Sequence, residues 1–203
     1  MNEFLVKIID AHGGTDRWHW NEKVEATIVS GGGLFALKGV PQDANPRRMT
    51  VWLHEERSSV SPYGAPDQRT MFTPERIAIE KLDGTMVAER YAPRDSFAGH
   101  QMNTPWDPLH RAYFNGEALW TYLTTPFLLA MDGVRVNIAG GFAAAQLTSD
   151  YVDANGIRLP SKRRAYTRGP DRRPILEMLM VSIDISDVSF TLRSGEKAYR
   201  SNA

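Results

Sequence analysis

The alternation of apolar and polar residues along most of the chain predicts a series of β-strands. Residues 49–54 illustrate the pattern, because Met49, Val51 and Leu53 share one face of an extended chain. A period of two residues is typical of a strand that buries one face. Comparable runs occupy residues 23–30, 33–39, 58–63, 69–73, 76–82, 85–91, 134–139, 142–152, 157–168 and 174–190. The pattern therefore predicts a protein built mainly from strands.

Short turn sequences between these runs predict that neighbouring strands are antiparallel. Asp83-Gly84 and Asn155-Gly156 are two-residue combinations that favour the tight turn of a β-hairpin. Three glycines at 31–33 and two at 140–141 also lie between predicted strands, and we interpret each group as a turn. Strands connected in this way form an antiparallel meander.

Two segments near the N-terminus have the spacing of helices. Between residues 4 and 9 the apolar side chains recur every three or four positions, and Gly13-Gly14 marks an end to this amphipathic helix. Charged residues interrupt the apolar positions, so the segment lacks the apolar core of a secretory signal, and we expect a cytoplasmic protein. Residues 15–23 predict a second short helical turn, with Thr15 or Asp16 as its N-cap.

Residues 106–130 form the most apolar and aromatic segment of the chain. Its longest uncharged part is shorter than the roughly 20 residues that a membrane-spanning helix needs. Asp107-Pro108 is typical of a helix start, and Asn115-Gly116 favours a break. We therefore predict two helices packed on the sheet, with Trp120 and Leu123 buried.

The last predicted strand is apolar on both faces between residues 175 and 181, except at Glu177. A strand that is covered on one face only would alternate with polar residues. We therefore expect apolar cover on both faces here, supplied by the aromatic helices. Where these helices meet the strand, an apolar crevice of roughly 300 Å³ or more is predicted if they do not pack completely.

These elements together predict an α+β fold in which a curved antiparallel sheet, a half-barrel, wraps around central helices. A length of 203 residues suits one domain, 1–203, and the polar end 193–203 is expected to form a flexible tail. Lysine and arginine balance aspartate and glutamate at 24 each, which argues against a nucleic-acid binder. The absence of cysteine excludes disulfides, thiolate nucleophiles and cysteine metal sites. No metal or cofactor is predicted.

Several segments also resemble a group of uncharacterised bacterial proteins. The residues that carry the resemblance are "AHGG" at 11–14, "FTPERIAIE" at 72–80, "SFAGH" at 96–100, residues 105–129, "DYVDANGIRLPSKRRAY" at 150–166 and "VSIDISDVSF" at 181–190. We associate this group with the fold of the periplasmic lipoprotein carriers. The resemblance implies a half-barrel around helices with an apolar cavity between them. Further strands of the group are expected at this point, but here only Met131-Asp132-Gly133 separates the aromatic helices from the next strand. If strands are missing, the half-barrel is shorter and leaves an edge or the cavity open.

The leading functional hypothesis is the non-catalytic binding of a hydrophobic or lipid-like small molecule between sheet and helices. Methionine and aromatic side chains adapt to varied apolar ligands. The candidate ligand-binding residues are Trp52, Phe72, Trp106, Tyr113, Trp120, Leu123, Phe127, Met178 and Met180. The same residues would equally well fill a core. An interaction protein that pairs through a sheet edge is a further alternative.

The alternative of an enzyme depends on His100, Asp107 and His110, because a histidine and a carboxylate can exchange protons with a substrate. Their spacing matches no zinc signature, and Asp107 before Pro108 is also explained as a helix cap. We therefore predict no enzymatic activity. A basic run that includes Lys162 and Arg168 suits either an anionic partner or a solvated strand face.

Overall fold

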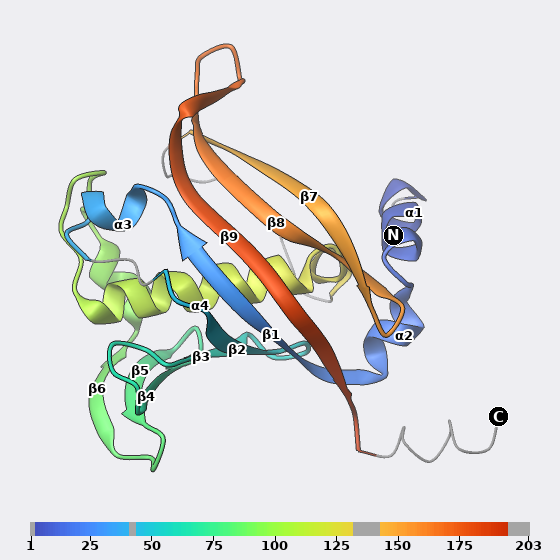
Figure 1. Ribbon diagram of the computed structural model, residues 1–203, viewed down its shortest axis with the longest axis horizontal. Helices are drawn as coiled ribbons and strands as arrows, with labels where there is room; N and C mark the ends of the chain where they lie inside the picture. Colours follow the sequence, from blue (N-terminus) through green and yellow to red (C-terminus); the bar gives the residue numbers. More distant parts are fainter. Residues whose placement is uncertain (1–2, 41–43, 132–142, 195–203) are drawn as a thin grey trace.

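Nine antiparallel strands form one curved sheet in the computed structural model, which describes residues 3–40, 44–131 and 143–194 (Figure 1). The strands are β1 (Asn21–Gly31), β2 (Arg47–Trp52), β3 (Arg57–Ser61), β4 (Gln68–Phe72), β5 (Arg76–Lys81), β6 (Met86–Tyr91), β7 (Ala144–Ala154), β8 (Ile157–Arg168) and β9 (Pro174–Leu192). Their order in the sheet is β6-β5-β4-β3-β2-β1-β9-β8-β7. The first and last strands of the chain therefore pair with each other inside the sheet.

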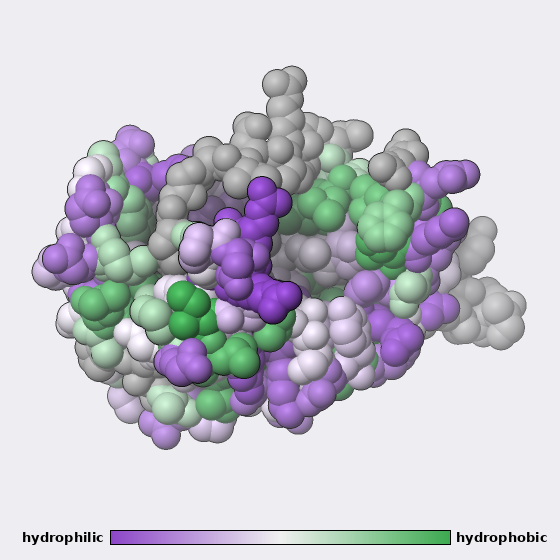
Figure 2. Space-filling view, turned by 90° about the horizontal axis from the view of Figure 1, so that it is seen from above, coloured by the Kyte–Doolittle hydropathy of each residue, from purple (hydrophilic) through white to green (hydrophobic). Residues whose placement is uncertain are grey.

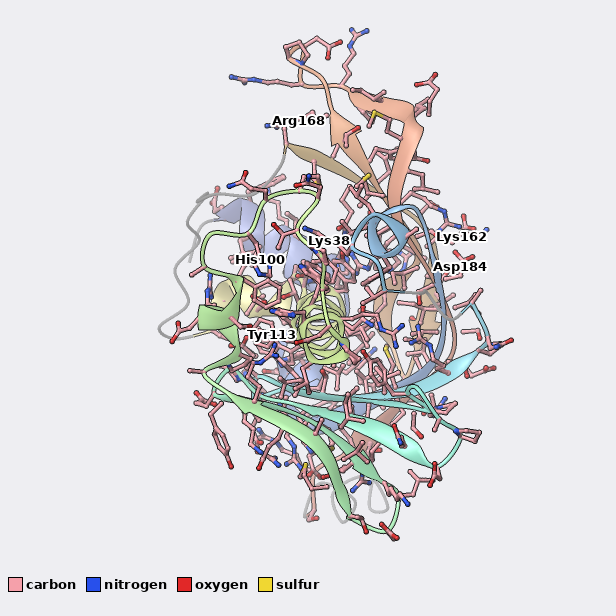
Figure 3. All side chains as sticks on the ribbon, turned by 90° about the vertical axis from the view of Figure 1, so that its left-hand side faces the viewer. Lys38, His100, Tyr113, Lys162, Arg168 and Asp184 are labelled. Atoms are coloured by element: carbon pink, nitrogen blue, oxygen red, sulfur yellow. The ribbon has the colours of Figure 1, made fainter. Side chains whose placement is uncertain are left out.

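One long helix lies on the concave side of this sheet, as Figure 3 shows by viewing it end-on. It is α4 (Pro108–Thr124), and it contacts β2, β3, β4 and β5. The shorter elements are α1 (Glu3–Ala11), α2 (Thr15–His19), α3 (Leu34–Leu37) and the 3₁₀ helices η1 (Pro93–Phe97) and η2 (Phe127–Ala130). The predicted fold class, a curved antiparallel sheet around central helical structure, is confirmed. No described helix is long and apolar enough to cross a membrane.

The helix α4 runs without the break that was predicted at Asn115-Gly116. A Cβ atom at Gly116 would lie 2.4 Å from Cγ of Phe72 on β4, and the Phe72 side chain is fully buried. Gly116 therefore allows close contact between helix and sheet, and it does not end the helix. The helix ends at Thr125, whose extended backbone is the conformation that a following proline, Pro126, favours.

Trp120 and Leu123 are buried, as predicted, and they hold α4 on the sheet. The indole Nε1 of Trp120 donates a hydrogen bond to the carbonyl oxygen of Trp52 at 2.9 Å. Ser58 on β3 donates from its hydroxyl to the carbonyl oxygen of Gly116 at 3.0 Å. The buried face of the helix is thus held by apolar contact and by two hydrogen bonds to neighbouring strands.

The prediction of a hairpin around the glycines at 31–33 was wrong. The strand β1 ends at Gly31, and residues Leu34–Leu37 form the short helix α3. A Cβ atom at Gly32, whose φ is +102°, would lie 2.3 Å from the carbonyl oxygen of Met180. The glycine is needed because the chain passes directly over the backbone of β9 at this point.

The expectation that β9 is covered on both faces was also wrong at its N-terminal end. Ile175, Leu176 and Met178 are exposed, Leu176 by 61%. This part of the 19-residue strand belongs to a long hairpin that extends beyond α4 (Figure 1). When the molecule is viewed from above, hydrophobic residues, drawn in green, are visible at the surface between hydrophilic ones (Figure 2). Burial begins at Met180, where β9 reaches the body of the protein.

The two predicted hairpin turns are confirmed, because β5 and β6 flank Asp83-Gly84 and β7 and β8 flank Asn155-Gly156. The helix α1 ends before Gly13-Gly14, as predicted, but the N-cap of α2 is Gly14, in place of Thr15 or Asp16. The predicted strand 134–139, its turn at 140–141 and most of the tail lie outside the described residues.

Replacement of Gly116 by alanine should destabilise the protein by about 1–3 kcal/mol, the usual effect of overpacking a core. Glycine to alanine inside a helix otherwise stabilises by roughly 0.5–1 kcal/mol. The overlap with Phe72 is expected to reverse that sign. Urea denaturation measures the change, and Glu117→Ala on the same helix is the control, expected to change stability by less than about 0.5 kcal/mol.

Trp120→Ala should lower the free energy of unfolding by about 3–5 kcal/mol, because it empties a core site and removes a hydrogen bond. Tyr91→Ala, at a residue that is 68% exposed, should change it by less than about 1 kcal/mol. Thermal or urea unfolding of both variants makes the comparison. A loss below about 1 kcal/mol for Trp120→Ala would contradict its place in the core.

Candidate functional site

A cavity of about 460 Å³ lies where α3, the segment after η1 and the first half of α4 meet. Five of the eight residues that line it are apolar or aromatic: Leu34, Phe97, Met102, Trp106 and Phe114. The three polar residues are Lys38, His100 and Gln101. Its volume falls within the range of about 300–1,000 Å³ that is typical of small-molecule sites. We therefore take it as the candidate functional site.

Hydrogen bonds join the two segments that form the cavity, the end of α3 and the segment before α4. The amide of Trp106 donates to the carbonyl oxygen of Lys38 at 2.8 Å, which joins the end of α3 to the segment before α4. The carbonyl oxygen of Gln101 accepts from the amide of Thr104 at 3.1 Å and from the ammonium of Lys38 at 2.8 Å. The walls of the cavity are therefore formed before any ligand binds.

Aromatic rings form one wall. Trp106 lies with its ring centroid 5.3 Å from Phe114 and 5.6 Å from Phe97. Phe35 packs behind them, edge-on to both Trp106 and Phe114. Such ring pairs are rigid and apolar, so the wall keeps its shape and favours contact with hydrocarbon or aromatic groups.

Lys38 brings a positive charge to this apolar surrounding. Its side chain is buried, and its Nζ lies 5.0 Å from the centre of the Trp106 ring. No carboxylate of the described residues lies within ion-pair distance of it, and it donates a hydrogen bond to the neutral carbonyl of Gln101. Burial lowers the pKa of Lys38 below its ordinary value, because the charged form is poorly solvated.

His100 lies near Lys38 at the same cavity (Figure 3). Its Nδ1 and the indole Nε1 of Trp106 are buried and have no hydrogen-bond partner among the described residues. Burial lowers the pKa of His100, and the neighbouring charges of His110 and Lys38 lower it further. The imidazole is therefore held in its neutral form.

The structure brings His110 and Asp107 close to His100, with 5.1 Å between the two imidazole centroids. Asp107 caps α4 by accepting from the His110 amide at 2.8 Å, and the Asp107 amide donates to Nδ1 of His110 at 3.2 Å. The other ring nitrogen of His110 lies 3.3 Å from the carbonyl oxygen of Ser96. The predicted capping role of Asp107 is confirmed.

Arg90 completes the arrangement around Asp107, with its Nη2 2.5 Å from Oδ2. Burial alone would raise the pKa of Asp107, but the hydrogen bonds from Arg90 and from the His110 amide keep it below its ordinary value. The carboxylate of Asp107 therefore stays ionised, and its oxygens are engaged by Arg90 and by the His110 amide. It is poorly placed to take a proton from a substrate in the cavity.

Of the nine residues predicted to bind a ligand, Trp106 lines this cavity. The others lie elsewhere, and as ligand contacts they stay predictions. Seven are buried or half-buried in the packing of α4, η2 and the sheet: Trp52, Phe72, Tyr113, Trp120, Leu123, Phe127 and Met180. Met178 is exposed. Burial raises the pKa of Tyr113 to about 12, so its hydroxyl stays protonated at neutral pH.

The predicted crevice between the aromatic helix and β9 is almost filled. Where Leu119 and Tyr122 of α4 approach Val181 and Ile183 of β9, the remaining space is about 10 Å³. That is at most the room for a single water molecule, about 10–15 Å³. The prediction of a gap of roughly 300 Å³ at this contact was therefore wrong, and the large cavity lies beside it, with Phe114 bordering both spaces.

A second cavity of about 260 Å³ lies beside α2 and η2. It contains His19 and His54, whose rings are 5.8 Å apart, together with Asp16. The Nε2 of His54 is already within 2.9 Å of the carbonyl oxygen of Asn21. Across the described ranges, no three histidine, aspartate or glutamate side chains are grouped to hold a metal ion.

Two cations of the basic run on β8 are paired with carboxylates of the neighbouring strands. Lys162 lies 2.5 Å from Asp150, and Arg164 lies 2.7 Å from Asp184. The intervening Arg163 is buried and donates to the carbonyl oxygen of Tyr122. Of the two interpretations of this run, these pairs favour a solvated strand face over a binding site for an anionic partner.

Acid should destabilise the protein through His100, whose pKa is lowered by burial. The unfolded chain titrates this group near about pH 6.5, so below that pH the unfolded state binds more protons. The stabilisation is complete above about pH 6.5 and is lost as the pH falls toward the folded-state pKa. Between about pH 7.5 and about pH 5.5, the free energy of unfolding measured with urea should fall by less in His100→Asn than in the native protein. Equal losses would contradict this assignment.

No family model and no curated protein matches the chain. Among solved structures, it is similar to the crystal structure of a LolA superfamily protein from Nitrosomonas europaea. The two sequences are 10% identical, the match covers 95% of this chain and 93% of that chain, and the TM-score is 0.43. The fold class of this chain therefore follows from its own sheet and helix, and its function has to be inferred from its own cavity.

Proposed function

We propose that the protein binds a hydrophobic small molecule in the cavity between α3, the segment after η1 and α4, without catalysing a reaction. The observation that carries this proposal is a preformed space of about 460 Å³ with a mainly apolar and aromatic lining. The space opens to solvent on one side, so a small molecule can reach it.

The lining suits a ligand with an extended apolar body. Phe97, Trp106 and Phe114 offer flat rings, and Met102 offers a flexible side chain that can adjust to the shape of a ligand. Gln101 is exposed and lies at the rim. A ligand could therefore enter beside the segment 97–106 without disturbing the sheet.

Two features support a role without catalysis. The polar atoms of Asp107 and His110 are engaged in the start of α4, so they are not free to exchange protons with a bound molecule. In the described residues, no serine or threonine hydroxyl is hydrogen-bonded to His100 as an activated nucleophile would be. The presence of Lys38 and His100 at one cavity keeps an enzyme as the second candidate.

Titration with N-phenylnaphthylamine, an uncharged apolar dye, tests the proposal. The dye should bind at one saturable site, because the cavity holds a single apolar molecule of its size. Met102→Trp should fill part of the space and weaken binding by at least about tenfold, equal to about 1.4 kcal/mol. Dye fluorescence measures the affinity.

The matched control is Met86→Trp, the same substitution at a 40% exposed position on β6 that does not line the cavity. It should leave the affinity for the dye unchanged. The proposal fails if the folded native protein shows no saturable binding, or if both variants lose binding equally.

A further inference from the structure

We propose that the ligand of this cavity is an apolar carboxylic acid, with Lys38 as the counter-ion of its carboxylate. This inference rests on the proposed function, because it concerns the same cavity. It adds the chemical class of the ligand and names the residue that selects it.

Lys38 is a buried cation for which the described residues provide no anion. Its side chain is 5% exposed, and its Nζ donates to the neutral carbonyl oxygen of Gln101. An ammonium has three donors, so this hydrogen bond leaves two of them to be filled. Placing a charge in an apolar surrounding is unfavourable unless an opposite charge accompanies it. A ligand carboxylate would supply that charge.

The ring of Trp106 compensates only part of this deficit. Its face lies 5.0 Å from Nζ, and a cation–π contact contributes about 0.5–2 kcal/mol. The buried Arg163 has a different environment, since it donates to the carbonyl oxygen of Tyr122 and lines neither of the two larger cavities. Lys38 thus combines burial with direct access to an apolar cavity.

Two residues of the lining carry further buried polar atoms. Among the described residues, neither the indole Nε1 of Trp106, a donor, nor Nδ1 of His100 has a hydrogen-bond partner. A carboxylate offers about four lone-pair positions on two oxygens, more than an alcohol can offer. It can accept from Lys38 and still accept a second hydrogen bond from the lining.

The number of cations limits the head group to a single negative charge. Among the described residues, Lys38 is the one lysine or arginine in the lining of the cavity. Phosphate groups carry more charge and are usually bound by arginine forks or several donors. Five of the seven other described residues in the lining are apolar or aromatic, so the body of the ligand should be a hydrocarbon chain or an aromatic ring. A fatty acid or an aryl-alkanoic acid has this chemistry.

Isothermal titration calorimetry with decanoate, methyl decanoate and decanol tests the inference on the native protein. All three share the same chain, so they differ only in the head group. Decanoate should bind at least about tenfold more tightly than the ester or the alcohol. Equal affinity for the three ligands would overturn the inference that the ligand is a carboxylic acid. Saturable binding of all three would still support the proposed hydrophobic site.

The variant Lys38→Met, which keeps the length of the side chain and removes its charge, should reduce the preference for decanoate to within about twofold. Its affinity for N-phenylnaphthylamine should be retained, which shows that the cavity is still folded. Lys81→Met, at an exposed lysine of β5, is the control and should keep the preference. If Lys38→Met still prefers decanoate, another group binds the ligand carboxylate, and the role of Lys38 is overturned.

If Lys38→Met does not fold, the comparison of the three ligands on the native protein still decides the question. If none of the ligands binds and the dye does not bind either, both the proposed function and this inference fail. Dye binding without binding of decanoate would overturn the inference alone.

Discussion

The packing of α4 against the concave face of the sheet is the contact on which the rest of the structure depends. Gly116 lets the helix approach Phe72, and Trp120 and Leu123 fill the space above β2. A sheet with one apolar face needs such a cover, because its side chains would otherwise stay in water. The strands β2 to β5 curve below the helix, and β1 and β9 rise beside it (Figure 3). Burial of this single helix therefore unites both halves of the sheet.

The start of the same helix also determines where the candidate site lies. Asp107 caps α4, and Trp106 just before it is bonded through its amide to the carbonyl of Lys38. This bond holds α3 against the segment that follows η1, and the rings of Trp106 and Phe114 form the wall between them. Next to this wall, the middle of α4 is packed against β9 with almost no space left. Phe114 borders both the filled contact and the cavity, so the packed core directly supports one side of the site.

Only part of the site could be predicted from the sequence. Trp106 was predicted because it is aromatic and belongs to the most apolar segment. Lys38 was missed because it lies in a segment, 33–39, that was interpreted as a strand, and nothing in its neighbours reveals that it is buried. His100 was considered as a catalytic group, yet its place beside Lys38 depends on a contact between segments about 60 residues apart. Contacts of this kind leave no local pattern in the sequence.

The sequence by itself determined the nine strands that the structure describes, the two hairpin turns, the helix cap at Asp107 and the fold class, because each depends on side-chain period or on neighbouring residues. Its further prediction of a strand at 33–39 was wrong. Tertiary structure decided the features that depend on distant partners. Gly116 continues a helix because Phe72 needs the space, and Gly32 crosses β9 where a hairpin was expected. The apolar end of β9 is exposed because the strand extends past the helix. Local preference is weak compared with the volume and hydrogen bonds that a folded neighbour imposes, so these positions could not be predicted from local sequence.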